Sequence, residues 1–439
     1  MRLRHLIPAL GLALLPIAGF AQNSTPTFNN TPLLRPDGGS EPALAIGQDS
    51  TMVVGALSWQ LFQTNVWKGP FGSTPVFQGA PDANIGAGIG GGDEDWEIGS
   101  TGTLHGTTLM FFFNPKTHLK QLGVSAIACP RVDTSGNFAH CTSQIIDQTQ
   151  ADRQWVTSNG SHVWISYHDS GHSSVIHVQR SDDDGLTWKR VGDPIVGQGS
   201  TTGDATFNNI QGELEADPTT GILYDVYAAG VTGVLKARTT SFNKVYVSRS
   251  LDGGQTWAAS IAISEPDGSS FVNVFPALAV DPVNGDLYAT GSDSHNVLVA
   301  KSSDHGQTWS AQRAVNSGAA ATAIFPAIAA RNGVVDLSYY GTAASSKNDP
   351  NASWNVFLAQ SANGGATYQQ SLVTSSPNHT GVICTNGTGC APGTRNLLDL
   401  FEVAIDPATG KAAIVYTNDL LTTDNSGARL PQIVLAQQK

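Results

Sequence analysis

The phrase Ser-x-Asp-x-Gly-x-Thr-Trp occurs three times in the chain and constrains its fold more than any other feature. The copies begin at Ser181, Ser250 and Ser302, and a fourth, at Ser361, has Asn in place of Asp and Tyr in place of Trp. Each copy follows an alternating apolar run, such as Val245–Val247, which places it in a hairpin turn between two strands. A hairpin repeated in this way predicts a chain built from similar β-sheet units.

A second repeated phrase marks the first strand of each unit. It reads Phe-Pro-Ala-Leu-Ala-Val-Asp-Pro at Phe275–Pro282, and related phrases begin near residues 41, 95, 153, 212, 325 and 401. Two strands from this phrase and two from the hairpin make a four-stranded antiparallel unit of roughly 40 to 60 residues, the size of a propeller blade. We therefore predict an all-β fold, a single β-propeller of seven blades. Six blades is the alternative, if one of the first two units is an insertion.

The last unit contains only three expected strands, near residues 401–405, 412–416 and 432–436. The segment Thr27–Leu34 could supply the fourth, which would join the two ends of the ring and leave no open sheet edge there.

The repeated hairpin phrase resembles the Asp-box, or BNR repeat, of the sialidase-like β-propellers. In that family the Asp-box lies on the outer part of the blade, away from the active site, so we interpret the four copies as structural. The resemblance implies a glycoside hydrolase of the exo-alpha-sialidase type. Three arginines would bind the carboxylate of an acidic sugar, a Tyr assisted by a Glu would be the nucleophile, and an Asp would be the acid/base.

The resemblance places substrate on the face where the first strands begin. The family's first Arg lies in an Arg-Ile-Pro phrase, but here the matching phrase is Ser40-Glu41-Pro42, so that Arg is absent. Order along the chain suggests catalytic candidates and substrate-binding candidates on this face. The catalytic candidates are Glu213, Tyr340, Asp152 and Asp95, and the binding candidates are Arg153, Arg395, Arg238, His168, Asp169 and Trp96.

Carboxylates also recur along the first strands. Aligning the phrases puts Glu97, Glu213 and Glu402 in one column that faces the central channel, where other units have Ala. This column predicts a polar, water-containing channel, in which the carboxylates are either solvated and hydrogen-bonded or catalytic.

Composition limits the partners and the compartment. The 439-residue chain has a formal net charge of −12 and few basic residues, which excludes nucleic acid and anionic membranes as expected partners. Residues 1–21 have a basic start and a short apolar core, which predicts a secretory signal peptide followed by one domain over residues 22–439. In an exported protein, Cys129 with Cys141 and Cys384 with Cys390 predict two local disulfides. We expect a monomer, secreted to the periplasm or the medium, with no cofactor and no metal.

Two main functions remain open on the sequence. One is a secreted sialidase-like glycoside hydrolase acting on terminal acidic sugars, and the other is a non-catalytic propeller that binds a glycan or a protein. A third is a hydrolase or lyase of neutral polysaccharide, because an acidic face repels anionic sugars.

Overall fold

The computed structural model describes residues 25–82, 85, 88–113, 120–130, 140–169, 175–195, 209–230 and 242–439. The predicted signal peptide, residues 1–21, and Arg238 lie outside these ranges.

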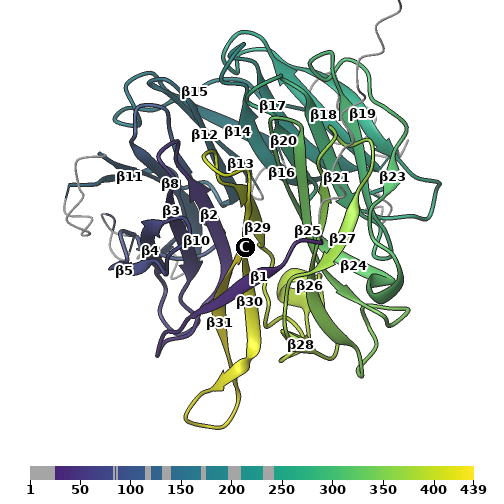
Figure 1. Ribbon diagram of the computed structural model, residues 1–439. Helices are drawn as coiled ribbons and strands as arrows, with labels where there is room; N and C mark the ends of the chain where they lie inside the picture. The colour runs from purple at the N-terminus through teal and green to yellow at the C-terminus, as the bar shows by residue number, and fades with distance from the viewer. Residues whose placement is uncertain are drawn as a thin grey trace, which may run out of the picture.

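Seven antiparallel sheets follow one another around a common axis, in chain order from purple to yellow in Figure 1. This arrangement confirms the all-β, seven-bladed propeller and excludes the six-bladed alternative. In the first three blades the strands run from the axis outward. Blade 1 contains β2 (Ser40–Ile46), β3 (Thr51–Leu57), β4 (Thr64–Pro70) and β5 (Val76–Gly79). Blade 2 contains β7 (Asp95–Ile98), β8 (Leu104–Thr107), β10 (Lys120–Cys129) and β11 (Thr142–Asp147), and is widened by β6 (Ile89–Gly90) and β9 (Leu109–Phe113). Blade 3 contains β12 (Ala151–Asn159), β13 (His162–Asp169), β14 (Val175–Ser181) and β15 (Lys189–Arg190).

The next three blades carry the better conserved copies of the second phrase. Blade 4 contains β16 (Asn209–Ala216), β17 (Leu223–Ala229), β18 (Lys244–Ser250) and β19 (Ala258–Ser264). Blade 5 contains β20 (Ala277–Val280), β21 (Leu287–Ser292), β22 (Val297–Ser302) and β23 (Arg313–Ala314). Blade 6 contains β24 (Thr322–Arg331), β25 (Val334–Thr342), β26 (Ser353–Ser361) and β27 (Gln369–Leu372), with β28 (His379–Thr380) paired to β26. The described helical elements are single 3₁₀ turns, η1 (Gly318–Ala320) and η2 (Gly387–Gly389).

Blade 7 closes the ring with strands from both ends of the chain. It contains β29 (Glu402–Ile405), β30 (Ala412–Thr423), β31 (Arg429–Gln438) and β1 (Phe28–Leu33). Strand β1 pairs antiparallel with β31 in a register that runs from Phe28 opposite Gln438 to Leu33 opposite Ile433. The predicted closure by the N-terminal segment is therefore confirmed, and Figure 1 shows β1 lying against the C-terminal strands.

The Asp-boxes form the hairpins between the third and fourth strands of blades 3 to 6, as predicted. In blade 4, the Asp252 carboxylate accepts hydrogen bonds from Ser250 Oγ (2.8 Å), from Thr256 N (2.8 Å) and from Thr256 Oγ1 (2.6 Å). The degenerate copy keeps the frame, because Asn363 Oδ1 accepts from Thr367 N (3.0 Å) and Asn363 Nδ2 donates to Thr367 Oγ1 (2.9 Å). The repeat is therefore a self-bonded turn, consistent with a structural role.

This comparison of copies generates a stability prediction. We expect Asp252→Ala to lower the free energy of unfolding by about 1–2 kcal/mol, because several bonds to turn groups are lost. Asp252→Asn should cost less than half as much, since Asn363 makes equivalent bonds in blade 6. Urea unfolding of the two variants measures the difference, and equal losses would contradict this account of the turn.

Candidate active site at the channel entrance

A bulge near the start of the inner strands brings ionisable side chains to one end of the ring. The pairing register shifts there in β2, β12, β16 and β24. Glu41, Arg153 and Phe325 occupy three of these shifts with φ of 53°, 55° and 56°, and Asp93, just before β7, has φ of 45°. Residues other than Gly rarely adopt such angles. Because Phe325 shares the conformation without carrying a charge, the strain belongs to the fold, and the charged residues make use of it.

Glu41, Asp93, Asp152, Arg153, Arg395 and Asp399 form what we call the entrance cluster. The Glu41 carboxylate lies between two neighbours, since its oxygens accept from Asp93 N (3.4 Å) and from Asp399 N (3.2 Å). On the other side, Arg395 makes a bidentate ion pair with Asp399, through Nε to Oδ1 at 3.1 Å and through Nη2 to Oδ2. Residues from blades 1, 2 and 3 and from the segment before β29 thus meet at the axis.

The segment from Gly381 to Leu400 delivers Arg395 and Asp399 to this cluster. The predicted disulfide Cys384–Cys390 is present within it, as is Cys129–Cys141 in blade 2. Ile383 and Leu397 are each only 1 % exposed and hold the segment against the propeller. Lys347 Nζ adds donated bonds to Asn273 Oδ1 (2.6 Å) and to Thr385 Oγ1. The two site residues therefore sit on an anchored support.

Burial and mutual repulsion raise the pKa of the acids in the entrance cluster. Burial, and then the charge of Asp399, raise the pKa of Glu41 to about 7. The pKa of Asp93 is raised well above its ordinary value by burial, by Glu41 and by Asp152, and its carboxyl hydrogen-bonds that of Asp152. Two carboxyl groups can hydrogen-bond only when a proton lies between them, and one of the pair then titrates late. Asp93 is therefore protonated at neutral pH.

The two arginines differ in their surroundings. Burial works against the charge of Arg395, but Asp399, Glu41 and Asp93 together raise its pKa. The Arg153 guanidinium lies over the Phe275 ring, 5.5 Å from its centroid, and no described side chain accepts a hydrogen bond from it. Burial and Arg153 lower the pKa of His168 to about 4, so this histidine adds no third positive charge at pH 7. Arg153 is the described cation at the entrance that is available to an anionic ligand.

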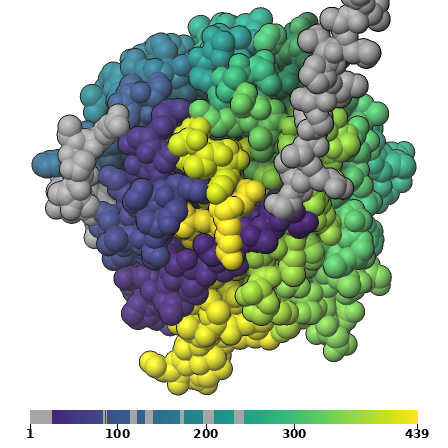
Figure 2. All heavy atoms as spheres, viewed as in Figure 1, coloured from purple at the N-terminus to yellow at the C-terminus, as the bar shows by residue number. Residues whose placement is uncertain are grey.

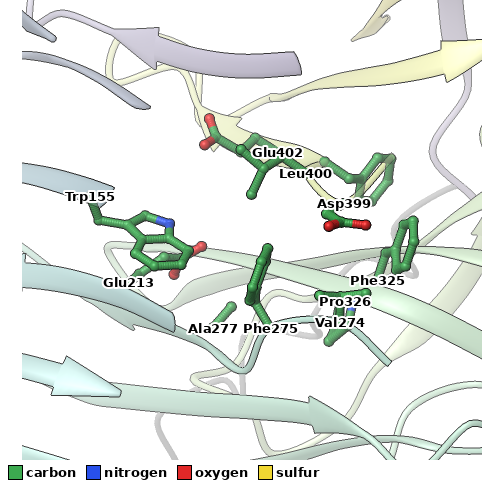
Figure 3. Close-up of a pocket in the computed structure, with 11 residues that line it drawn as sticks. Trp155, Glu213, Val274, Phe275, Ala277, Phe325, Pro326, Asp399, Leu400 and Glu402 are labelled. Carbon is green, nitrogen blue, oxygen red and sulfur yellow. The ribbon is translucent and has the colours of Figure 1, made fainter. Parts of the chain in front are cut away.

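An aromatic layer made of Trp155, Phe275, Phe325 and Phe401 lies beneath the entrance cluster. It encloses a cavity of about 20 Å³ that Asp399 and the channel residues Glu213 and Glu402 also line, room for about one water. The rings of Trp155 and Phe275 meet edge to face at 5.2 Å, and Figure 3 shows Glu213 beside Trp155 and Asp399 toward Phe325. The layer therefore separates the entrance cluster from the channel.

Below this layer, five carboxylates surround a channel cavity of about 160 Å³: Asp95, Glu97, Glu213, Glu215 and Glu402. Asp95 Oδ2 accepts from Val156 N (2.7 Å), Glu213 Oε2 from Leu278 N (2.8 Å), and Glu402 Oε2 from Leu44 N. Each bond joins an inner strand to the next blade around the ring.

These bonds correct the alignment of blade 2. Asp95 makes the same interblade bond as Glu213 and Glu402, so it occupies their column. Glu97 therefore lies one step further down, beside Glu215, and the predicted column of Glu97, Glu213 and Glu402 is wrong by two residues. The error arose because blade 2 lacks the Pro that marks the phrase in its neighbours.

Burial is the first cause of a raised pKa at every channel carboxylate. It raises the pKa of Asp95 to about 6 and that of Glu97 to about 8, and it raises those of Glu213, Glu215 and Glu402 well above the ordinary range. Folding therefore favours the protonated acids. Their contribution to stability is complete below the unfolded pKa near 4.5 and is lost as the pH rises through the folded pKa.

We expect Glu97→Gln to flatten the fall in stability between pH 5 and pH 8. The variant should be more stable than the wild type at pH 8 by roughly 2–4 kcal/mol, because no charge has to form in the channel. Urea unfolding at several pH values measures this slope. Asp182→Asn is the control, since bonds from Lys189 and Arg180 lower the pKa of the exposed Asp182 to about 2 and leave nothing to titrate in that window. An unchanged slope in Glu97→Gln would contradict the assignment.

The structure distributes the residues predicted from the sequence over different environments. Asp152, Arg153 and Arg395 belong to the entrance cluster, while Asp95 and Glu213 lie in the channel. Tyr340 is fully buried between Phe325 and Phe401, and its hydroxyl accepts from Thr417 N at 3.0 Å, so the structure does not bring it to the cluster.

Trp96 and Asp169 are also buried. Trp96 is 3 % exposed and packs between Gly55 and Gly106, where a methyl group on either glycine would lie 2.3 Å from its ring. Asp169 bonds His177 Nε2 at 3.1 Å. Their predicted contact with substrate stays a prediction without support from their positions.

Sequence reasoning missed Glu41, Asp93 and Asp399 as members of the site. Glu41 stands where the sialidase-like family has its first Arg, so the missing Arg was itself the signal. Asp399 gave none, because its position depends on the folding of a long segment before β29.

The described residues contain no group of three or more His, Cys, Asp or Glu side chains arranged to hold a metal ion. In the described part of the chain, no helix has the length and apolar character needed to cross a membrane.

The chain is a seven-bladed β-propeller with distant structural similarity to several carbohydrate-active enzymes. One solved structure is a protein of unknown function from Dyadobacter fermentans, with 14 % identity over 93 % of this chain and 98 % of that chain and a TM-score of 0.49. An ulvan lyase of polysaccharide lyase family PL25 has 11 % identity over 93 % and 94 % of the two chains, with a TM-score of 0.49. A Trypanosoma rangeli sialidase has 13 % identity over 91 % of this chain and 55 % of that chain, with a TM-score of 0.44.

No protein-family model matches the sequence, and no curated protein matches it. At identities of 11–14 % and TM-scores below 0.5, the similar structures assign neither a substrate nor a reaction to this chain.

Proposed function

We propose that the protein is a glycan-cleaving enzyme whose active site is the entrance cluster and whose substrate carries an acidic sugar. The observation that supports this most directly is the pair of carboxyl groups with opposed protonation on either side of Glu41. Asp93 is held protonated by burial and neighbouring acids, whereas Asp399 carries its charge in the ion pair with Arg395. Environments that separate two acids in this way are typical of an acid and its ionised partner.

Each residue has a defined role in this proposal. Asp93 donates a proton to the oxygen of the leaving sugar, and Asp152 holds that proton in position through the shared hydrogen bond. Asp399 stabilises the positive charge that develops on the sugar ring or activates the attacking water. Arg153 binds the substrate's carboxylate, since it is the described entrance cation without an acceptor. The aromatic layer excludes bulk water from below.

We expect Asp93→Asn to reduce turnover at least 100-fold, because the amide cannot donate a catalytic proton. Turnover of a fluorogenic glycoside of an acidic sugar, such as a sialoside, measures the effect. Asp182→Asn, on an exposed Asp-box hairpin, is the matched control and should retain full activity. Full activity in Asp93→Asn would contradict the proposed role.

Glu41→Gln should move the alkaline limb of the pH–activity profile to lower pH by half a unit or more. The charge on Glu41 raises the pKa of Asp93, so removing it lets Asp93 lose its proton at lower pH. The profile of kcat against pH measures this shift. An alkaline limb that stayed in place would show that Asp93 is not the group that titrates.

Arg153→Ala should raise KM for an acidic substrate at least tenfold and leave KM for a neutral glycoside within a factor of two. Arg313→Ala is the matched control, because Arg313 lies on β23 and bonds Ala366 O. Equal effects on both substrates would show that Arg153 supports the structure and does not bind the substrate carboxylate.

The second candidate, a propeller that binds glycans without cleaving them, is favoured by one observation. Both oxygens of Glu41 already accept backbone N–H groups, and Asp399 is already paired, as in a purely structural network. Binding to acidic glycans without turnover at high protein concentration would select this candidate.

A further inference from the structure

Outside the entrance cluster, an open surface pocket of about 570 Å³ lies between blades 6, 7 and 1. We call it the side pocket. Its argued residues are Trp59, Pro350, Thr380, Asn396, Asp424 and Arg429. They come from the β3–β4 loop, the β25–β26 loop, β28, the segment before β29 and the tip of the β30–β31 hairpin. Figures 1 and 2 show that hairpin, in yellow, projecting from the body of the ring.

The side pocket adjoins the entrance cluster through the chain itself. Asn396 lines the pocket, while the preceding residue, Arg395, pairs with Asp399 at the entrance. The loop that carries Trp59 packs against Gly91, where a methyl group would lie 2.5 Å from Gln63 N, and Asp93 follows two residues later. Both walls of the pocket are therefore backed by residues of the entrance cluster.

The side chains on the pocket floor are held in place. Asp419, which is fully buried, accepts from Asn396 Nδ2 (2.8 Å), from Arg429 Nη1 (3.2 Å) and from His379 Nδ1 (2.9 Å). Arg429 also donates to Thr380 Oγ1 (2.7 Å). A ligand that meets such preset groups loses less free energy to the ordering of side chains.

The chemistry of the lining favours a saccharide. The Trp59 side chain is 37 % exposed and offers an aromatic face to the apolar face of a sugar ring. The amide of Asn396 and the hydroxyl of Thr380 match sugar hydroxyls, and the charges of Arg429 and Asp424 are opposite, so the pocket has no net attraction for an anion. The volume lies in the range of small-molecule pockets, which is about 300–1,000 Å³.

We propose that the side pocket is a saccharide-binding subsite that holds a neutral sugar unit several residues along the chain cleaved at the entrance. This inference rests on the proposed function for the direction of the chain, although binding in the pocket does not require cleavage. It makes the substrate an oligosaccharide or polysaccharide with an acidic unit at Arg153 and a neutral unit at Trp59.

A glycan array carrying neutral and uronic-acid-containing oligosaccharides of one to six sugar units provides the test. Trp59→Ala should bind the glycans of four or more units at least tenfold more weakly than the wild type and leave shorter ones unchanged. Trp59→Phe should stay within threefold, because it keeps an aromatic face. Leu186→Ala, an exposed apolar residue on an Asp-box hairpin, is the matched control and should match the wild type.

The outcomes separate the side pocket from the active site. Loss of long-glycan binding in Trp59→Ala, with unchanged turnover of a short fluorogenic glycoside, supports both proposals. The same loss without any turnover supports the subsite and rejects the proposed cleavage. Equal binding by the wild type and Trp59→Ala at every length, or no binding of any array glycan by the wild type, overturns the subsite. A thermal unfolding midpoint within 2 °C of the wild type, expected for a partly exposed side chain, shows that Trp59→Ala is folded.

Discussion

The bond from an inner-strand N–H to a carboxylate of the preceding blade is the interaction on which the ring depends. The inner strand of every blade is a sheet edge, and its unpaired N–H groups face the axis. Asp95, Glu213 and Glu402 satisfy such groups in blades 3, 5 and 1. Each bond joins two sheets that share no backbone pairing, so the carboxylates hold the blades in order around the channel.

These bonds have an electrostatic consequence that extends to the entrance. Carboxylates crowded around one axis, with little water, cannot all ionise at neutral pH. The channel acids are therefore raised in pKa, and the same crowding at the entrance keeps Asp93 protonated beside Asp152 and Glu41. Asp399 escapes this effect because Arg395 neutralises it. The difference between Asp93 and Asp399 thus follows from which acid received an arginine.

Most of the fold could be predicted from the sequence, but less of the site. The Asp-boxes and the inner-strand phrase located all seven blades and the closing strand β1, because these signals are local and repeat. Asp152, Arg153 and Arg395 were also found, since polar residues near strand starts share one face. Tyr340 was chosen by its order along the chain alone, and the structure buries it against Phe325 and Phe401. Glu41 was overlooked because the sequence was searched for an Arg at that position.

The sequence by itself determined the blade, because a turn such as Ser250–Trp257 bonds only to itself and needs no distant partner. It also determined the number of blades, through the count of repeated phrases. The tertiary structure alone decided which acids hold a proton and which cation is available to a ligand. Those properties depend on burial and on charges contributed by other blades, and residues such as Glu41 and Asp399, 358 positions apart, become neighbours only when the ring closes.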